Sequence, residues 1–295
     1  MGYLHIVIAL FFGQLKGFCG KKQSQYISGV RDAVVANFLR MLCCVATSLI
    51  LLIPVGQLGA LRLGVPGLLI SLLSGIANAG IVVLWLLSVR GNAYVLLAVF
   101  STFGVIVPLL LCRILYDEKI RLIQWCGFVL LCFAVWIMCS YSTSLKGKKM
   151  SAKEYLILII YGLLNGTADF SQKLFVNTYP DGSKSVFNFY TFLFAAVVIG
   201  IVVLFLSRGK DVKPCPVKKI WIFIVIMAVS LFANAYFKTA AAEVLPAVQL
   251  YPLLQGGALS CAMLMAAILF GEKITKRSVL GITLCFAALL MINVL

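Results

Sequence analysis

The sequence predicts an all-α integral membrane protein with ten transmembrane helices, arranged as two inverted five-helix repeats. Composition is the first observation: of 295 residues, 63% are hydrophobic and 12% are charged, and the mean hydropathy is +1.08. A soluble domain carries about twice that charged fraction. Length is the second, since spans of about 20 residues leave room for about ten helices and no soluble domain. The third is an internal duplication.

The duplication is clearest where two apolar runs meet. The tripeptide Glu-Lys-Ile occurs at 118–120 and again at 272–274, each time followed by a glycine at the same spacing. Further pairs keep nearly the same offset: Phe18 and Lys21 with Phe170 and Lys173, Asn37 with Asn188, and Asn78 with Asn234. A leucine-rich chain gives single matches by chance, but an ordered series of matches indicates a repeated unit. We therefore expect a first repeat over 1–145, a basic linker over 146–153 and a second repeat over 154–295.

The first repeat is divided by lysines, prolines and turn residues. A span over 3–18 closes with Lys21 and Lys22, and a span over 32–53 stops at Pro54. The third, over 67–89, has Trp85 toward its end, where aromatic residues anchor helices at the interface. The fourth covers 93–115, and Pro108 inside it predicts a kink, because proline lacks an N–H and its ring clashes with the preceding turn. The fifth runs over 120–140.

The second repeat follows the same plan. Its spans are expected over 155–176, 185–206, 220–242 and 245–270, with the last beginning at 275. The span over 245–270 contains Pro252 and Gly256-Gly257, which predict an interrupted helix at the place that matches Pro108. Because each repeat has an odd number of spans, the second copy enters the membrane upside down. Inverted repeats place a substrate site near the midplane and expose it alternately to each side.

The net charge of +16 reflects loops and not a nucleic-acid surface. Most Lys and Arg residues lie in short breaks between apolar runs, as orientation determinants do. The odd-numbered loops hold the majority, which by the positive-inside rule places both termini outside the cell. The ten cysteines lie mostly inside apolar runs without CxxC spacing, so we expect reduced packing residues.

Several polar residues inside the spans are candidates for substrate binding or coupling. Asp169 is the acidic residue that lies well inside a span, and an intramembrane carboxylate is a functional hypothesis by default. The alternative is a structural ion pair with Lys173, one turn later, or with Lys16 of the first span. If desolvated, Asp169 suits proton coupling.

The other candidates have equally plain structural alternatives. Arg40 and Lys238 could bind a substrate carboxylate, or snorkel and bond to carbonyls. Asn78 and Asn234 could bind substrate or join helices. We expect the polar stretch of the ninth span to face the polar stretch of the fourth span and to form a binding site. The alternative is that Gly256 and Gly257 of the ninth span only permit close helix packing. The members of the polar stretch are Gln249, Tyr251 and Gln255, facing Ser101 and Thr102.

Ten spans in a five-plus-five plan, the Gly-Glu-Lys-Ile junction before the last span, and Phe12-Gly13-Gln14 in the first resemble the EamA family of the drug/metabolite transporter superfamily. The resemblance covers essentially the whole chain. It implies a central cavity lined mainly by helices one, three, four, six, eight and nine, and export or uptake of small solutes coupled to protons or by exchange. It also implies termini inside the cell, opposite to the charge distribution.

The function expected is secondary active transport of a small metabolite or drug-like solute by alternating access. The alternatives are a polytopic enzyme acting on lipid and a channel. An enzyme would need convergent acid, base or metal ligands, and the sequence has one histidine and no nucleophile motif. We expect no cofactor apart from possible proton coupling, no metal site, and as partners a small-molecule substrate and membrane lipid but no nucleic acid. A monomer in a cell membrane, that of bacteria in particular, is expected.

Overall fold

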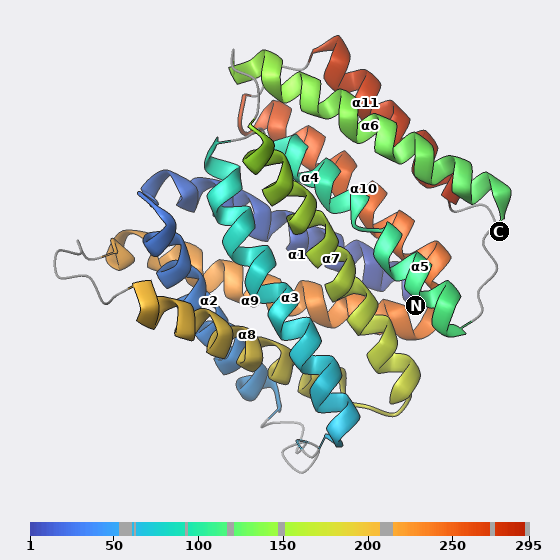
Figure 1. Ribbon diagram of the computed structural model, residues 1–295. Helices are drawn as coiled ribbons and strands as arrows, with labels where there is room; N and C mark the ends of the chain where they lie inside the picture. The colour runs from blue at the N-terminus through green and yellow to red at the C-terminus, as the bar shows by residue number, and fades with distance from the viewer. Residues whose placement is uncertain are drawn as a thin grey trace. The chain divides into compact units, whose positions relative to one another are not determined.

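The computed structural model describes residues 1–52, 61, 63–91, 94–116, 121–146, 151–206, 215–271 and 275–292. Within these ranges the chain is almost entirely α-helical and contains no strand (Figure 1). The helices are α1 (Gly2–Gln23), α2 (Val30–Leu52), α3 (Val65–Gly91), α4 (Tyr94–Phe103), α5 (Ile106–Tyr116), α6 (Leu122–Lys146), α7 (Ala152–Thr178), α8 (Lys184–Leu206), α9 (Val217–Val244), α10 (Ala247–Ile268) and α11 (Lys276–Ile292). Both Glu-Lys-Ile junctions, 118–120 and 272–274, lie outside the described residues.

The helices identify a multi-pass α-helical membrane protein. Among the described residues, seven helical segments are long and apolar enough to cross a bilayer, and 122–134 and 279–292 form shorter apolar helices. Helix α7 has the length of a span, but it carries polar residues such as Asn165, Asp169 and Lys173. The structure therefore confirms the predicted class, an α-helical membrane protein, but does not confirm that the number of spans is ten. Helix α6 also continues to Lys146, beyond the end expected at 140.

The chain forms two compact units, each built from both halves of the sequence. Unit 1 comprises Met1–Arg90 and Ser171–Val244, and unit 2 comprises Gly91–Phe170 and Leu245–Leu295. In unit 1, α1 packs against α9, and α2 packs against both α8 and α9. In unit 2, α10 packs against α4 and α11, and α6 lies along α11 (Figure 1). Each unit thus joins helices that are far apart in the sequence.

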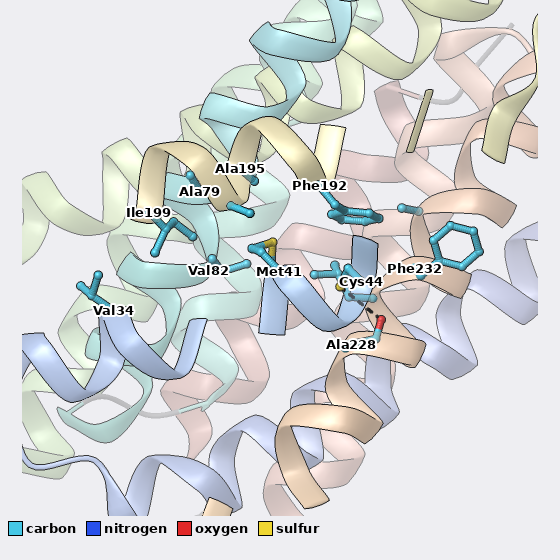
Figure 2. Packing of buried hydrophobic residues seen from close by; sticks show 13 residues of the cluster. Val34, Met41, Cys44, Ala79, Val82, Phe192, Ala195, Ile199, Ala228 and Phe232 are labelled. Atoms are coloured by element: carbon cyan, nitrogen blue, oxygen red, sulfur yellow. Dashed lines mark hydrogen bonds between the residues drawn. The ribbon is translucent and has the colours of Figure 1, made fainter. Parts of the chain in front are cut away.

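The core of unit 1 is a cluster of mainly small and medium-sized apolar side chains. Met41 and Cys44 of α2 pack between α8 and α9 (Figure 2). Phe192 of α8 and Phe232 of α9 have ring centroids 6.3 Å apart. The Cys44 thiol donates a hydrogen bond to the carbonyl of Ala228, at 3.4 Å. Small residues on α8 and α9 allow this close approach, as is usual between helices in membranes.

Two lysines that the repeat pairs with each other make the same kind of contact in unit 1. The Lys21 ammonium donates to the carbonyl of Val89 at 3.1 Å, and that of Lys173 donates to the carbonyl of Ala242 at 2.8 Å. Val89 and Ala242 lie in the last turns of α3 and α9, where carbonyls lack partners within the helix and a positive charge is favourable. Each lysine therefore caps the C-terminus of a neighbouring helix.

The predicted break at Pro108 is present. Between α4 and α5 the backbone bonds tighten: Gly104 N–H donates to Ser101 and Val105 N–H to Thr102. Proline at 108 cannot bond to the carbonyl four residues earlier, and its ring excludes that carbonyl from the helical position. The matching prediction for Pro252 is wrong, because α10 continues through it. In a membrane the neighbouring backbone groups have no water to bond to, which favours keeping the helix intact.

Candidate functional site

Asp169 is the centre of a buried polar network in unit 2. Asp169 is 1% exposed, and its carboxylate oxygen Oδ2 accepts a hydrogen bond from Gln255 Nε2 at 3.2 Å. One turn earlier on α10, the hydroxyl of Tyr251 donates to the main-chain carbonyl of Asp169 at 2.6 Å. Tyr251 is completely buried. Helices α7 and α10 are therefore joined at Asp169 by one side-chain bond and one backbone bond.

The network continues from α10 to α4. Ser101 Oγ lies 3.5 Å from Gln255 Oε1, so Gln255 uses its amino group on Asp169 and its carbonyl on Ser101. On α7, Tyr161 is buried, and the amide of Asn165 one turn later donates to its main-chain carbonyl at 2.8 Å. A chain of polar groups thus runs from Asp169 through Gln255 to Ser101. In a low-dielectric interior such a connected chain holds its members firmly in place.

Glycines bring the break between α4 and α5 directly onto α7. A Cβ on Gly104 would overlap the carbonyl of Gly162, and a Cβ on Gly166 would overlap the carbonyl of Gly104. A Cβ on Gly162 would overlap the carbonyl of Phe100. Backbone meets backbone here, as small residues spaced four apart permit in membrane helices. Asp169 follows Gly166 by less than one turn, so this crossing fixes the helix that carries it.

The structure brings together Asp169, Tyr251, Gln255 and Ser101, which the sequence proposed in separate stretches. Thr102, adjacent to Ser101, is buried and donates within its own helix, to Ala98 at 2.9 Å. Gln249 is half-buried on α10. The sequence-based argument missed Tyr161, Asn165 and the glycine crossing. Two signals could have found them: the Gly162-x3-Gly166 pattern, and the one-turn spacing of Tyr161 and Asn165.

The remaining candidates lie in unit 1. Asn78 and Asn234, predicted to be equivalent, differ: Asn78 donates to the carbonyl of Ser74 in its own helix at 2.8 Å, whereas Asn234 donates across to Ala9 of α1 at 2.6 Å. Asn234 therefore acts as an interhelical tie. Lys173 caps α9 as described, and Lys16 on α1 and Lys238 on α9 are half-buried.

Arg40 also lies in unit 1, inside the protein. Arg40 is 3% exposed, and its Nη1 lies 4.0 Å from the sulfur of Met227. Of the alternatives considered for Arg40, snorkelling toward water does not fit this burial.

The described residues contain no group of three or more His, Cys, Asp or Glu side chains that could hold a metal ion. The nine cysteines described there carry free thiols. The Asp169 network offers hydrogen-bonding groups and one buried carboxylate.

Comparison with known proteins agrees with this architecture. A model of the EamA-like transporter family matches residues 152–294. A solved structure, titled only "Crystal structure of protein", matches with a TM-score of 0.62 and 11% identity over 96% of this chain and 95% of that chain. At that identity the likeness concerns the fold alone. No curated protein sequence matches significantly. Residues 152–294 thus match the EamA-like transporter family, which is part of the drug/metabolite transporter superfamily.

Proposed function

We propose that this protein is a secondary active transporter that moves a small metabolite or drug-like solute across the cell membrane. The observation that carries the proposal is the buried carboxylate of Asp169, held by Gln255 beside a broken helix. A charged group in the membrane interior is costly and persists where it serves binding or ion movement. The match of residues 152–294 to the EamA-like transporter family supports transport over catalysis. The bacterial cytoplasmic membrane is the location that we propose.

The proposed arrangement is ten spans in two inverted repeats, with α4 and α5 counted as one span. The paired caps of Lys21 on α3 and Lys173 on α9 support it, because equivalent residues bond to equivalent helix ends. Asn37 and Asn188 support it as well, since each donates to the carbonyl one turn earlier in its own helix, at 2.8 and 2.9 Å. Such repeats favour alternating access to a midplane site.

In the proposed mechanism Asp169 binds either a proton or a cationic group of the solute. The Gln255 amide stabilises the ionised carboxylate, and Tyr251 holds the α7 backbone so that the carboxylate keeps its position. A carboxylate that exchanges a proton for solute would couple transport to the proton gradient. The side chain of Ser101 extends the polar path from Gln255 to α4.

The test is a current measurement on solid-supported membranes carrying the purified protein, screened against amino acids, sugars, nucleosides and quaternary cations. Asp169→Asn removes the charge but keeps the shape, and Asp181→Asn in the exposed loop after α7 is the matched control. We expect a substrate-dependent transient that Asp169→Asn abolishes and Asp181→Asn preserves, with both variants monodisperse. Normal transients from Asp169→Asn would reduce the carboxylate to a structural role, and product formation in lipid without currents would replace the transporter by an enzyme.

A further inference from the structure

Arg40 is a buried cation for which the part of the chain that the structure describes supplies no counter-ion. It lies about 15 Å along α2 from the first helical residue, at 1.5 Å per residue, which places it near the middle of the span. Its Nε is buried and has no hydrogen-bond partner. Within the described residues no carboxylate forms an ion pair with the guanidinium, and Nη1 donates a weak hydrogen bond to the sulfur of Met227 at 4.0 Å.

The surroundings do not offset the charge. Cys44, one turn later on α2, gives its thiol hydrogen bond to Ala228. Lys16 of α1 is close enough to act electrostatically on Cys44, so a second cation approaches the same region. Met227 is completely buried. An unpaired buried cation is strongly unfavourable unless a partner compensates it, and here the nearby charged group has the same sign.

The geometry around the guanidinium suits an organic anion. Nε has no hydrogen-bond partner, and the planar edge formed by Nε and Nη2 of an arginine matches the two oxygens of a carboxylate. Met227, which contacts Nη1, meets Trp85 at Gly20: a Cβ on Gly20 would lie 3.0 Å from the Met227 methyl and would overlap the ring of Trp85. Methionine and aromatic rings adapt to apolar ligands of varied shape.

We propose that Arg40 is the anchor of a binding site in unit 1 for a small organic anion, whose carboxylate accepts hydrogen bonds from the guanidinium while its apolar part lies against Met227 and Trp85. This site is separate from the Asp169 network of unit 2. It adds a ligand class, a carboxylate with an apolar body, to the transport function proposed above. Binding at Arg40 does not depend on which group couples transport.

The experiment titrates the purified full-length protein in detergent with benzoate and with benzamide, which has nearly the same shape but no charge. Tryptophan fluorescence is the readout, because Trp85 is half-buried beside Gly20, and Trp85→Phe checks the source of the signal. We expect benzoate to bind roughly tenfold or more tightly than benzamide. Arg40→Lys should weaken benzoate binding about tenfold by losing the fork, and Arg40→Met should abolish it. Arg113→Gln, at an exposed position on α5, should bind as the wild type does.

A stability measurement keeps the test valid if a variant folds poorly. If Arg40 has no structural partner, Arg40→Met should keep or raise the apparent melting temperature without anion and lose the rise that benzoate gives the wild type. Equal affinity for benzoate and benzamide, benzoate binding by Arg40→Met, or no binding of benzoate, acetate or phosphate by the wild type would overturn the proposal. So would a fall of many degrees in Arg40→Met, which would reveal a structural partner. None of these outcomes changes the interpretation of the electrical currents recorded for Asp169→Asn.

Discussion

The crossing of α7 with the break between α4 and α5 makes a sharp prediction about Gly166. In Gly166→Ala the new methyl would overlap the carbonyl of Gly104 and lie 2.7 Å from Cβ of Val107. Neither atom is the flexible end of a side chain, so the helices must separate. Overpacking of this kind costs about 1–3 kcal/mol. Against it stands the better helix propensity of alanine, worth about 1 kcal/mol.

The net loss expected for Gly166→Ala is therefore up to about 2 kcal/mol, the difference between these two effects. For a chain of this size, about 1 kcal/mol corresponds to roughly 2–4 °C in melting temperature. Thermal unfolding of the purified protein in detergent, followed by tryptophan fluorescence at a fixed scan rate, measures it. Because Asp169 follows on the same helix, substrate-dependent currents should fall as well.

Gly256→Ala is the matched control in the same unit. Its Cβ would lie 3.3 Å from the tip of Leu289, and this flexible end can move aside. The variant should be as stable as the wild type or gain up to about 1 kcal/mol from helix propensity. A Gly166→Ala protein that melts together with Gly256→Ala would refute the inferred backbone contact.

Three further predictions concern single contacts. Tyr251→Phe removes the bond to the Asp169 carbonyl and should lower the free energy of unfolding by about 1 kcal/mol, measured by thermal melts; an unchanged melt would contradict the bond. Lys173→Met leaves the Ala242 carbonyl without its cap and should cost about 1–2 kcal/mol, and stability equal to the wild type would argue against capping. Burial raises the pKa of Cys215, just before α9, to about 11, so its thiolate becomes more abundant only as pH rises toward that value. Its alkylation by iodoacetamide, quantified by peptide mass spectrometry, should rise about tenfold per pH unit from 7 to 10, whereas a plateau near pH 9 would contradict the shift.

The sequence predicted those structural features that depend only on residues nearby in the same helix. The break before Pro108 follows from the missing N–H and the proline ring, which act within one turn of the same helix. Burial of Asp169 was implied by its place in an apolar run, since a carboxylate facing lipid is unfavourable. Pro252 shows the limit: the same residue type leaves α10 continuous, because the surroundings of a helix decide whether its freed carbonyl is tolerated.

Sequence by itself determined the class of this protein, a multi-pass helical membrane protein, because transfer into a bilayer depends on summed composition and on length. The resemblance to the EamA family followed from the junction motif and the five-plus-five arrangement of the spans. Only the tertiary structure decided which polar groups meet. In the folded protein Gln255 bonds to Asp169, and Lys173 bonds to the C-terminal end of α9. Asn234 bonds to another helix whereas Asn78 bonds within its own. Arg40 is buried. Hydrogen bonds require an approach of about 3 Å, and the packing of helices far apart in the sequence sets that approach.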